Sequence, residues 1–106
     1  YGLAFSGNNT LFSGSKGKSL LKWNIKAGRS TVLYKSDFYI NSVAWSGKTE
    51  IAFHLPDYQI GIMNLSTKTI TRVLSGHSSF VNTLFFLSPG LLMSSGNDAR
   101  IIIHQL

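Results

Sequence analysis

His77, Ser94 and Asp98 are the side chains in this sequence whose types could perform chemistry together. In a serine-nucleophile triad an aspartate orients a histidine, and the histidine takes the proton of the serine hydroxyl. Such a site also needs donors for an oxyanion and, in many hydrolases, a sharp nucleophile elbow around the serine. No such motif accompanies Ser94, which lies in the run Met93-Ser94-Ser95-Gly96. We therefore predict that the three residues are not a catalytic site and that the protein is not an enzyme.

Other kinds of chemical site have less support. The chain has no cysteine, so thiolate zinc sites and disulfides are excluded. His54 and His104 are single histidines on apolar segments, and such residues are more often satisfied core or surface side chains than metal ligands. Gly14, Gly17 and Gly28 do not make a phosphate loop, which needs a strand followed by a helix. The sequence predicts no metal site and no cofactor.

Short strands are the elements that must position these side chains. Between Gly76 and Leu106 an alternating apolar segment, a Pro-Gly turn, a second apolar segment and the run 101–103 follow one another. No stretch of ten or more residues has the apolar period of a helix. The chain is therefore predicted to be all-β, with turns at its glycine, asparagine and proline clusters.

The strands recur with a period of about 40 residues. Residues 3–6 align with residues 43–46 (43 − 3 = 40), and residues 84–87 follow (84 − 43 = 41). The same offsets relate Leu11, Ile51 and Leu92, then Leu20, Ile60 and Ile101, then Ile25, Leu65 and Leu106. Four short strands in each period of this length are typical of a β-propeller blade, a four-stranded antiparallel sheet.

The third period resembles a WD40 repeat. Gly76, His77 and Asp98 match the Gly-His pair and the turn aspartate of that family, while His104 and Gln105 stand where its Trp-Asp dipeptide would be. The resemblance implies a buried hydrogen-bonded set made by the histidine, a strand serine, the turn aspartate and the tryptophan. The members of this set that the three periods supply are His77, Ser94, Asp98, Asp57 and Trp23.

The periods divide the chain into a first blade at about 1–35, a second at about 36–75 and a third at about 76–106 that lacks its outer strand. Propellers usually close with four to eight blades. We therefore expect an incomplete ring that belongs to a longer chain and packs against the remainder of its own propeller. A ring closed by several copies of this chain is the alternative.

The resemblance implies a binding scaffold for protein partners within a multi-subunit complex. Loops of one type gather on one rim of a propeller, and the rim with the histidine and aspartate turns would contact partners. The residues predicted on that rim are Lys16, Lys18, Phe38, Tyr39, Tyr58, Phe80 and Asn97. Aromatic side chains with a few charges suit protein recognition.

A second, local resemblance covers about ten residues. Asp37-Phe38-Tyr39-Ile40-Asn41, followed by Trp45-Ser46, is similar to the opening of the propeller in the Cdc20/Cdh1 co-activators of a ubiquitin ligase. This resemblance implies a substrate adaptor that acts in the cell cycle. The alternative interpretation is that Phe38 and Tyr39 belong to a loop that packs on the next blade.

The charge is basic and uneven. Ten Lys and Arg against four Asp and Glu give a formal net charge of +6, and seven of the ten cations fall in the first half of the chain. A basic face favours an anionic partner, so RNA within an RNA-containing particle, or an acidic protein, is the alternative partner. Without cysteines, an apolar leader or an apolar run long enough to span a membrane, we expect an intracellular protein, cytoplasmic or nuclear.

Overall fold

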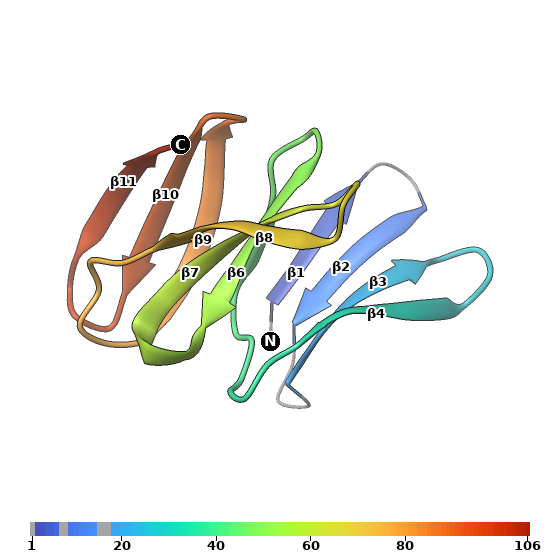
Figure 1. The fold of residues 1–106 in the computed structure, drawn as a ribbon, viewed down its shortest axis with the longest axis horizontal. Helices are drawn as coiled ribbons and strands as arrows, with labels where there is room; N and C mark the ends of the chain where they lie inside the picture. Colours follow the sequence, from blue (N-terminus) through green and yellow to red (C-terminus); the bar gives the residue numbers. More distant parts are fainter. Residues whose placement is uncertain (1, 7–8, 15–17) are drawn as a thin grey trace.

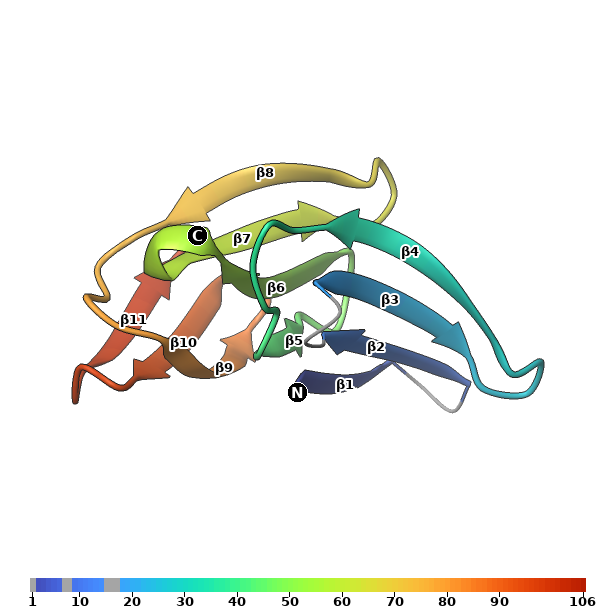
Figure 2. The same ribbon diagram turned by 90° about the horizontal axis from the view of Figure 1, so that it is seen from below.

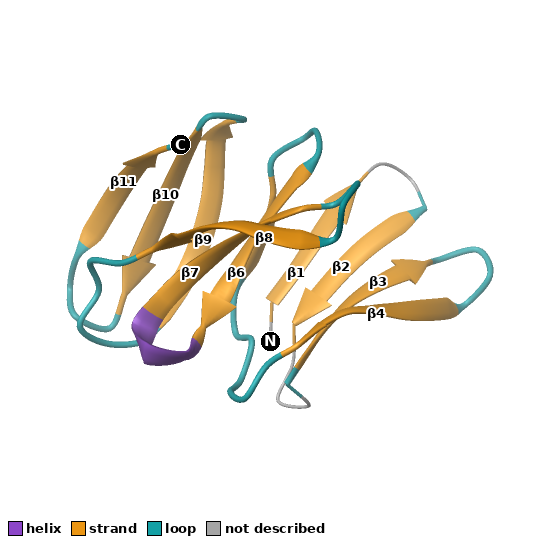
Figure 3. Cartoon of the chain, viewed as in Figure 1, coloured by secondary structure: helices purple, strands orange, loops and turns teal. Residues whose placement is uncertain are grey.

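The computed structural model describes residues 2–6, 9–14 and 18–106, and these residues form eleven β-strands and one short 3-10 turn (Figures 1 and 3). The first sheet contains β1 (Gly2–Ser6), β2 (Thr10–Gly14), β3 (Ser19–Asn24) and β4 (Arg29–Lys35). The second sheet contains β5 (Val43–Trp45), β6 (Glu50–Leu55), β7 (Gln59–Asn64) and β8 (Thr69–Leu74). The third sheet contains β9 (Val81–Ser88), β10 (Leu91–Gly96) and β11 (Ile101–Gln105). The turn η1 (Pro56–Tyr58) joins β6 to β7.

Within each sheet, strands that are consecutive in the chain pair with one another. All of these pairings are antiparallel, and each sheet is a simple meander of successive strands. The predicted all-β fold of small antiparallel sheets is confirmed. The repeat is visible in the register, because Phe12 lies opposite Lys22 in the first sheet and Ala52 lies opposite Ile62, each 40 residues later, in the second.

The three sheets fan out face to face, as Figure 2 shows. Successive strands run in opposite directions, so the connections fall on two rims (Figure 1). One rim carries the β2–β3, β4–β5, β6–β7, β8–β9 and β10–β11 connections, and we call it the η1 rim. The other carries the β1–β2, β3–β4, β5–β6, β7–β8 and β9–β10 connections, and we call it the opposite rim. The sheets make an arc rather than a closed ring.

Two apolar cores lie between the sheets. Between the first and second sheets the buried side chains are Phe12, Leu20, Ile40, Val43, Ile51, Phe53, Leu55 and Met63. Between the second and third sheets they are Ala44, Ala52, Ile60, Ile62, Val81, Leu84 and Leu92. The middle sheet is therefore covered on both faces, and its central strands are buried at nearly every position instead of at every second one.

The outer faces of the first and third sheets are open. In the first sheet Leu3 is 64% exposed, and in the third Ile101 is 72% and Ile103 is 59% exposed. These residues belong to apolar strands, and their alternation with buried neighbours places them on the face that turns away from the middle sheet. Each outer sheet thus presents an apolar face of the kind that the middle sheet buries.

Candidate functional site

The structure brings His77, Ser94 and Asp98 together in the third sheet. His77 lies in the β8–β9 connection, Ser94 is on β10, and Asp98 is in the β10–β11 turn. His77 Nδ1 lies 2.9 Å from Asp98 Oδ2 and 3.1 Å from Oδ1, and His77 Nε2 lies 2.7 Å from the Ser94 hydroxyl oxygen. The side chains of His77 and Asp98 are only 1% and 4% exposed.

The carboxylate decides how the protons are arranged. An ionised carboxylate can only accept, so His77 Nδ1–H donates to Asp98, and in the tautomer that this bond favours Nε2 is the acceptor. The Ser94 hydroxyl therefore donates to His77 Nε2. Its oxygen lies 2.9 Å from His104 Nε2, which must be the donor of that second bond. His104 is thus a fourth member of this hydrogen-bonded network. It stands at the position of the tryptophan in the WD40 repeat that this part of the sequence resembles.

His104 is a member of the network that was not predicted from the sequence. In the first sheet Trp23 Nε1–H donates to the Ser13 hydroxyl at 3.0 Å. Ser94 follows Ser13 by 94 − 13 = 81 residues and His104 follows Trp23 by 104 − 23 = 81, so an imidazole N–H occupies the place of an indole N–H. This shared offset of 81 residues was the feature of the sequence that could have identified His104 as the donor to Ser94.

Asp98 also organises the turn around it. It accepts from the backbone N–H of Ser78 at 2.9 Å and of Arg100 at 3.2 Å. Desolvation of the carboxyl raises its pKa, but the hydrogen bonds from Ser78, His77 and Arg100 outweigh this effect, so the pKa of Asp98 lies below its ordinary value. Asp98 therefore stays ionised and holds two connections of the η1 rim together.

Gly96 leaves the space that this network fills. A Cβ at Gly96 would lie 2.9 Å from both His77 Nδ1 and Asp98 Oδ1 and 2.8 Å from the Phe80 carbonyl oxygen. A side chain there would push the histidine and the carboxylate apart, so the hydrogen bonds depend on a glycine at this position.

The arrangement stabilises the fold and is unsuited to nucleophilic catalysis. Ser94 is 0% exposed, and its hydroxyl both donates to His77 and accepts from His104. A substrate carbonyl could reach this oxygen only if the second and third sheets separated. The buried hydroxyl instead satisfies two ring nitrogens at the interface of the sheets.

The second sheet fills the corresponding positions with apolar side chains. Phe53 and Met63, 40 residues after Ser13 and Trp23, are 0% and 1% exposed. The prediction that Asp57 joins a buried network is wrong. Asp57 is exposed on η1 with φ 62°, and the described residues offer its side chain no hydrogen bond. The positions that carry serine and tryptophan in the first sheet are Phe53 and Met63 here, so the network has no polar partners for it.

The rim residues predicted from the sequence fall on the η1 rim, apart from Lys16, which lies outside the described residues. Lys18 and Asn97 are exposed. The Phe38 and Phe80 rings stack with centroids 5.8 Å apart and an interplanar angle of 9°, and Tyr58 meets Phe80 edge-on at 5.5 Å. Tyr39 contacts Phe38 at 5.0 Å. Four aromatic residues from three connections therefore form one cluster, which we call the aromatic cluster.

A pocket of about 220 Å³ opens beside the aromatic cluster. Its lining residues are Phe38, His54, Pro56, Asp57, Tyr58 and Phe80. His54 Nδ1 lies 3.3 Å from the Tyr39 carbonyl oxygen, to which it donates, so Nε2 is left as a buried acceptor without a partner among the described residues. Burial lowers the pKa of His54, and the bond to Tyr39 offsets this only in part, so the ring is neutral at pH 7.

Among the residues that the structure describes, no three metal-ligating side chains converge on one point. The described part of the chain also contains no helix with the length and hydrophobicity needed to cross a membrane.

The network predicts how stability depends on pH. Burial, followed by the electrostatic repulsion that the neighbouring His77 exerts when it is protonated, lowers the pKa of His104 below its ordinary value of 6.5. The unfolded chain therefore binds more protons below pH 6.5, so stability is lost as the pH falls from that value towards the lowered pKa. Asp98, whose ordinary value is 3.8, adds a second loss as the pH falls through its own lowered pKa. We expect the midpoint of thermal unfolding to be constant above pH 7 and to drop in these two windows.

His104→Gln is the matched control for this prediction, because an amide N–H can still donate to Ser94 but does not titrate. Calorimetry of both proteins should show that the unfolding midpoint of His104→Gln falls less as the pH is lowered from 6.5. The part of the fall that remains in this variant is due to His54, whose pKa is also lowered. Identical pH profiles for the two proteins would contradict the assignment.

Comparison with known proteins agrees with this geometry. Residues 68–105 match the model of the WD domain, G-beta repeat. This segment runs from the turn before β8 to the end of β11, so the sequence repeat takes its first strand from the second sheet and three strands from the third. No curated protein matches the sequence.

Solved structures match nearly the whole chain. A chain in the crystal structure of a mitotic checkpoint complex superposes with a TM-score of 0.83 at 24% identity, over 96% of this chain and 32% of that chain. The computationally designed Ika4 protein superposes with a TM-score of 0.82 at 25% identity, over 98% of this chain and 64% of that protein. The present chain thus spans about a third of the first protein and under two thirds of the second. Residues 68–105 thus match a WD40 repeat, and the three sheets have the fold of β-propeller blades that together form part of a ring.

Proposed function

We propose that this chain is part of a non-catalytic WD40 scaffold that binds other proteins within a multi-subunit complex, and that partners dock on the η1 rim. The observation that carries the proposal is the aromatic cluster with its pocket of about 220 Å³. Tyr39 and Tyr58 are 40% and 38% exposed although their rings pack on Phe38 and Phe80. Rigid aromatic side chains at a surface supply contact area at a low cost in conformational entropy, and they dominate the energetics of many interfaces.

The position of the cluster supports the same conclusion. Phe38 comes from the β4–β5 connection, Tyr58 from η1 and Phe80 from the β8–β9 connection, so the cluster joins the second and third blades. The Asp98 network fixes the connection that carries Phe80, because Ser78 donates to Asp98, and the backbone N–H of Asn97 donates to the Phe80 carbonyl at 2.9 Å. A partner would therefore meet a preorganised surface rather than a loop that must be ordered on binding.

Photocrosslinking tests this proposal. A p-benzoylphenylalanine introduced in place of Tyr58 in the full chain is expected to crosslink to a protein partner in cells, because Tyr58 lies on the proposed surface. The same group in place of Val73, which is 53% exposed on β8 and belongs neither to the aromatic cluster nor to the lining of its pocket, is the control. Crosslinks of equal yield at both positions, or no protein crosslinked at position 58, would contradict the proposal.

Substitution gives the corresponding loss. Tyr58→Ser is expected to weaken retention of the crosslinked partner by about thirtyfold, the effect typical of a central aromatic residue at an interface. Val73→Ser should leave retention within about twofold, as surface positions outside an interface do. Retention is measured by quantitative mass spectrometry after affinity purification, and equal retention of the two variants would exclude the rim as the contact surface.

RNA binding by a subunit of an RNA-containing particle is the second candidate. It is favoured by the first blade, in which no acidic residue precedes Asp37 and the cations Lys18, Lys22, Lys26, Arg29 and Lys35 are all exposed. Phosphate binding through these cations would give an affinity that falls steeply as salt rises. A shallow salt dependence of RNA retention would exclude this candidate.

A substrate adaptor of a ubiquitin ligase, acting in the cell cycle, is a narrower form of the scaffold function and rests on the run 37–41. The stacking of Phe38 on Phe80 gives this run a packing role between the second and third blades. The broader function, a scaffold for protein partners, is therefore preferred.

A further inference from the structure

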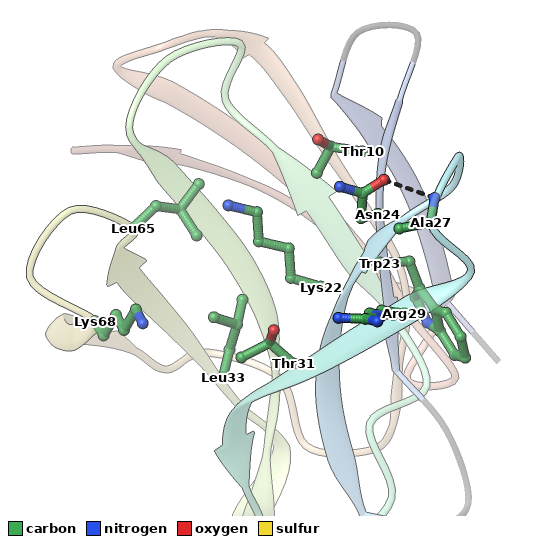
Figure 4. Close-up of a pocket in the computed structure, with 10 residues that line it drawn as sticks. All are labelled: Thr10, Lys22, Trp23, Asn24, Ala27, Arg29, Thr31, Leu33, Leu65 and Lys68. Carbon is green, nitrogen blue, oxygen red and sulfur yellow. Dashed lines mark hydrogen bonds between the residues drawn. The ribbon is translucent and has the colours of Figure 1, made fainter.

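A second cavity, of about 480 Å³, opens between the first and second blades towards the opposite rim (Figure 4). Its lining residues are Thr10, Lys22, Trp23, Asn24, Ala27, Arg29, Thr31, Leu33, Leu65 and Lys68. Leu65 and Lys68 lie in the β7–β8 turn of the second sheet, Ala27 lies in the β3–β4 turn, and the others are on β2, β3 and β4 of the first sheet. We call it the basic cavity.

Comparison of the first two sheets shows that the position of Lys22 can be filled by a buried apolar side chain. The second sheet has Ile62 at the corresponding position (62 − 22 = 40), and Ile62 is 0% exposed against the third sheet. The first sheet has an exposed lysine there, facing the second sheet from the middle of β3. Figure 4 shows its side chain extending towards Leu65 of the facing sheet. The first two blades therefore stay apart where the second and third close on one another.

The charge of the basic cavity is unbalanced. Lys22, Arg29 and Lys68 line it, and none of the lining residues is acidic. Within residues 2–6, 9–14 and 18–106 the single carboxylate within 4 Å of a basic side chain is that of Asp98, beside His77, so these three cations have no carboxylate partner in the described part of the chain. Three cations around one concave space favour an anionic ligand, since the low-dielectric walls concentrate their field.

The floor of the basic cavity is apolar. Leu33 and Leu65 pack against the core between the first two sheets while part of each side chain remains accessible. Thr31 supplies a hydroxyl, but the Asn24 carbonyl oxygen is already committed to the Asn9 amide at 3.0 Å and to the Ala27 backbone N–H at 3.1 Å. The lining therefore offers a small apolar site surrounded by cations.

We propose that the basic cavity binds an acidic segment of a partner protein, with one apolar side chain against Leu33 and Leu65 and its anionic groups against Lys22, Arg29 and Lys68. The anionic groups are carboxylates or phosphoserine phosphates, which share the same chemistry of recognition by cations. This site is distinct from the aromatic cluster, because it lies between a different pair of blades and on the opposite rim.

An acidic peptide fits this lining better than RNA does. Binding of single-stranded RNA combines cations with aromatic faces on which bases stack. Trp23 is the one aromatic residue that lines the cavity, and it follows Lys22 on β3, so its side chain lies on the other face of the sheet, where Nε1 donates to Ser13. The accessible floor is aliphatic, which suits a leucine side chain and gives a base no stacking surface.

Fluorescence anisotropy with short peptides tests the proposal on the full chain. The probe is a labelled Gly-Glu-Glu-Leu-Glu-Glu-Gly peptide, a second peptide has phosphoserine in place of two glutamates, and a third has glutamine in place of all four. The acidic probe or its phosphoserine form is expected to bind at least about tenfold more tightly than the glutamine peptide, as loss of one charge-assisted hydrogen bond alone would predict. The difference between the two acidic peptides identifies the preferred anion.

Matched variants locate the site. Lys22→Ile, which copies Ile62, and Lys68→Ala on the facing blade are each expected to weaken binding by about tenfold. Lys35→Ile removes the same charge from an exposed lysine outside the cavity and should change the affinity by less than about twofold. Arg29 and Lys68 are both exposed, so Arg29→Ala and Lys68→Ala remain a test even where Lys22→Ile fails to fold.

Three outcomes would overturn the proposal. The first is equal binding of the acidic and glutamine peptides. The second is an equal effect of Lys22→Ile and Lys35→Ile. The third is displacement of the acidic peptide by an oligouridylate at a lower concentration than unlabelled peptide requires, which would assign these cations to RNA. The crosslinking result at position 58 is independent of all three, so the basic cavity and the η1 rim succeed or fail separately.

Discussion

Replacing Phe53 by serine is expected to lower the free energy of unfolding by about 4–5 kcal/mol, because a buried ring is lost and a hydroxyl is left without a partner. Phe53 is 0% exposed between the first and second blades, and its ring packs against Tyr34 with centroids 5.2 Å apart. Serine is the residue that the other two blades have at this position, as Ser13 and Ser94. The substitution therefore makes the repeat more regular and the protein less stable.

The reason lies in the neighbours of Phe53. In the third blade the serine hydroxyl is satisfied by His77 and His104, and in the first it accepts from Trp23. The second blade has Met63, 1% exposed, in the place of the donor. A new hydroxyl would thus be buried against a thioether, which is a weak acceptor and has no N–H.

Phe53→Leu is the control for this experiment. It keeps an apolar side chain of similar volume and should cost less than about 2 kcal/mol, since cores tolerate hydrophobic exchanges that nearly conserve volume. Urea unfolding, followed by far-ultraviolet circular dichroism, measures both variants. A Phe53→Ser protein as stable as Phe53→Leu would mean that the two blades do not pack as described.

Ser94→Ala is expected to lower the free energy of unfolding by about 2–4 kcal/mol, because two buried ring nitrogens lose their partner at once. His77 Nε2 loses a donor and His104 Nε2–H loses an acceptor, and both residues are buried, each about 9% exposed. Alanine leaves a space smaller than a water molecule needs, so solvent does not replace the hydroxyl.

Ser95→Ala, one residue further along β10, is the control. Successive side chains of a strand point to opposite faces, so Ser95 lies on the open face of the third blade and takes no part in the network. Its replacement should change stability by less than about 0.5 kcal/mol. Equal effects of the two substitutions in urea unfolding would show that the hydroxyl of Ser94 is not needed by the histidines.

The expected effects of Phe53→Ser and Ser94→Ala both depend on how a blade fills its interface with the preceding blade. A blade can fill the face towards its preceding neighbour with a closed hydrogen-bonded set or with apolar side chains. The third blade uses the first solution and the second blade uses the other. A partly satisfied polar set at such an interface is worse than either, since each unpaired group keeps its full cost of desolvation.

Much of the architecture followed from local sequence. The offsets of 40 and 41 residues, the alternation of apolar and polar residues and the turns rich in glycine and asparagine predicted small antiparallel sheets. The resemblance of the third period to a WD40 repeat implied that Ser94 and Asp98 are partners of His77, as the structure has them. Asp57 was misassigned because a turn aspartate was read without the serine and tryptophan that would give it a role. A repeat fixes which position a residue occupies, but not which partners it finds there.

The sequence by itself determined the strands, their order and the repeat, because a period of two along each strand and of about 40 along the chain are properties of consecutive residues. Only the tertiary structure decided the contacts between blades: the donation by His104 to Ser94, the stacking of Phe38 on Phe80, and the space between Lys22 and Leu65. Each of these depends on how far apart two sheets settle and which faces they turn to one another. Side chains from different blades fix that distance jointly, so no single stretch of sequence carries it.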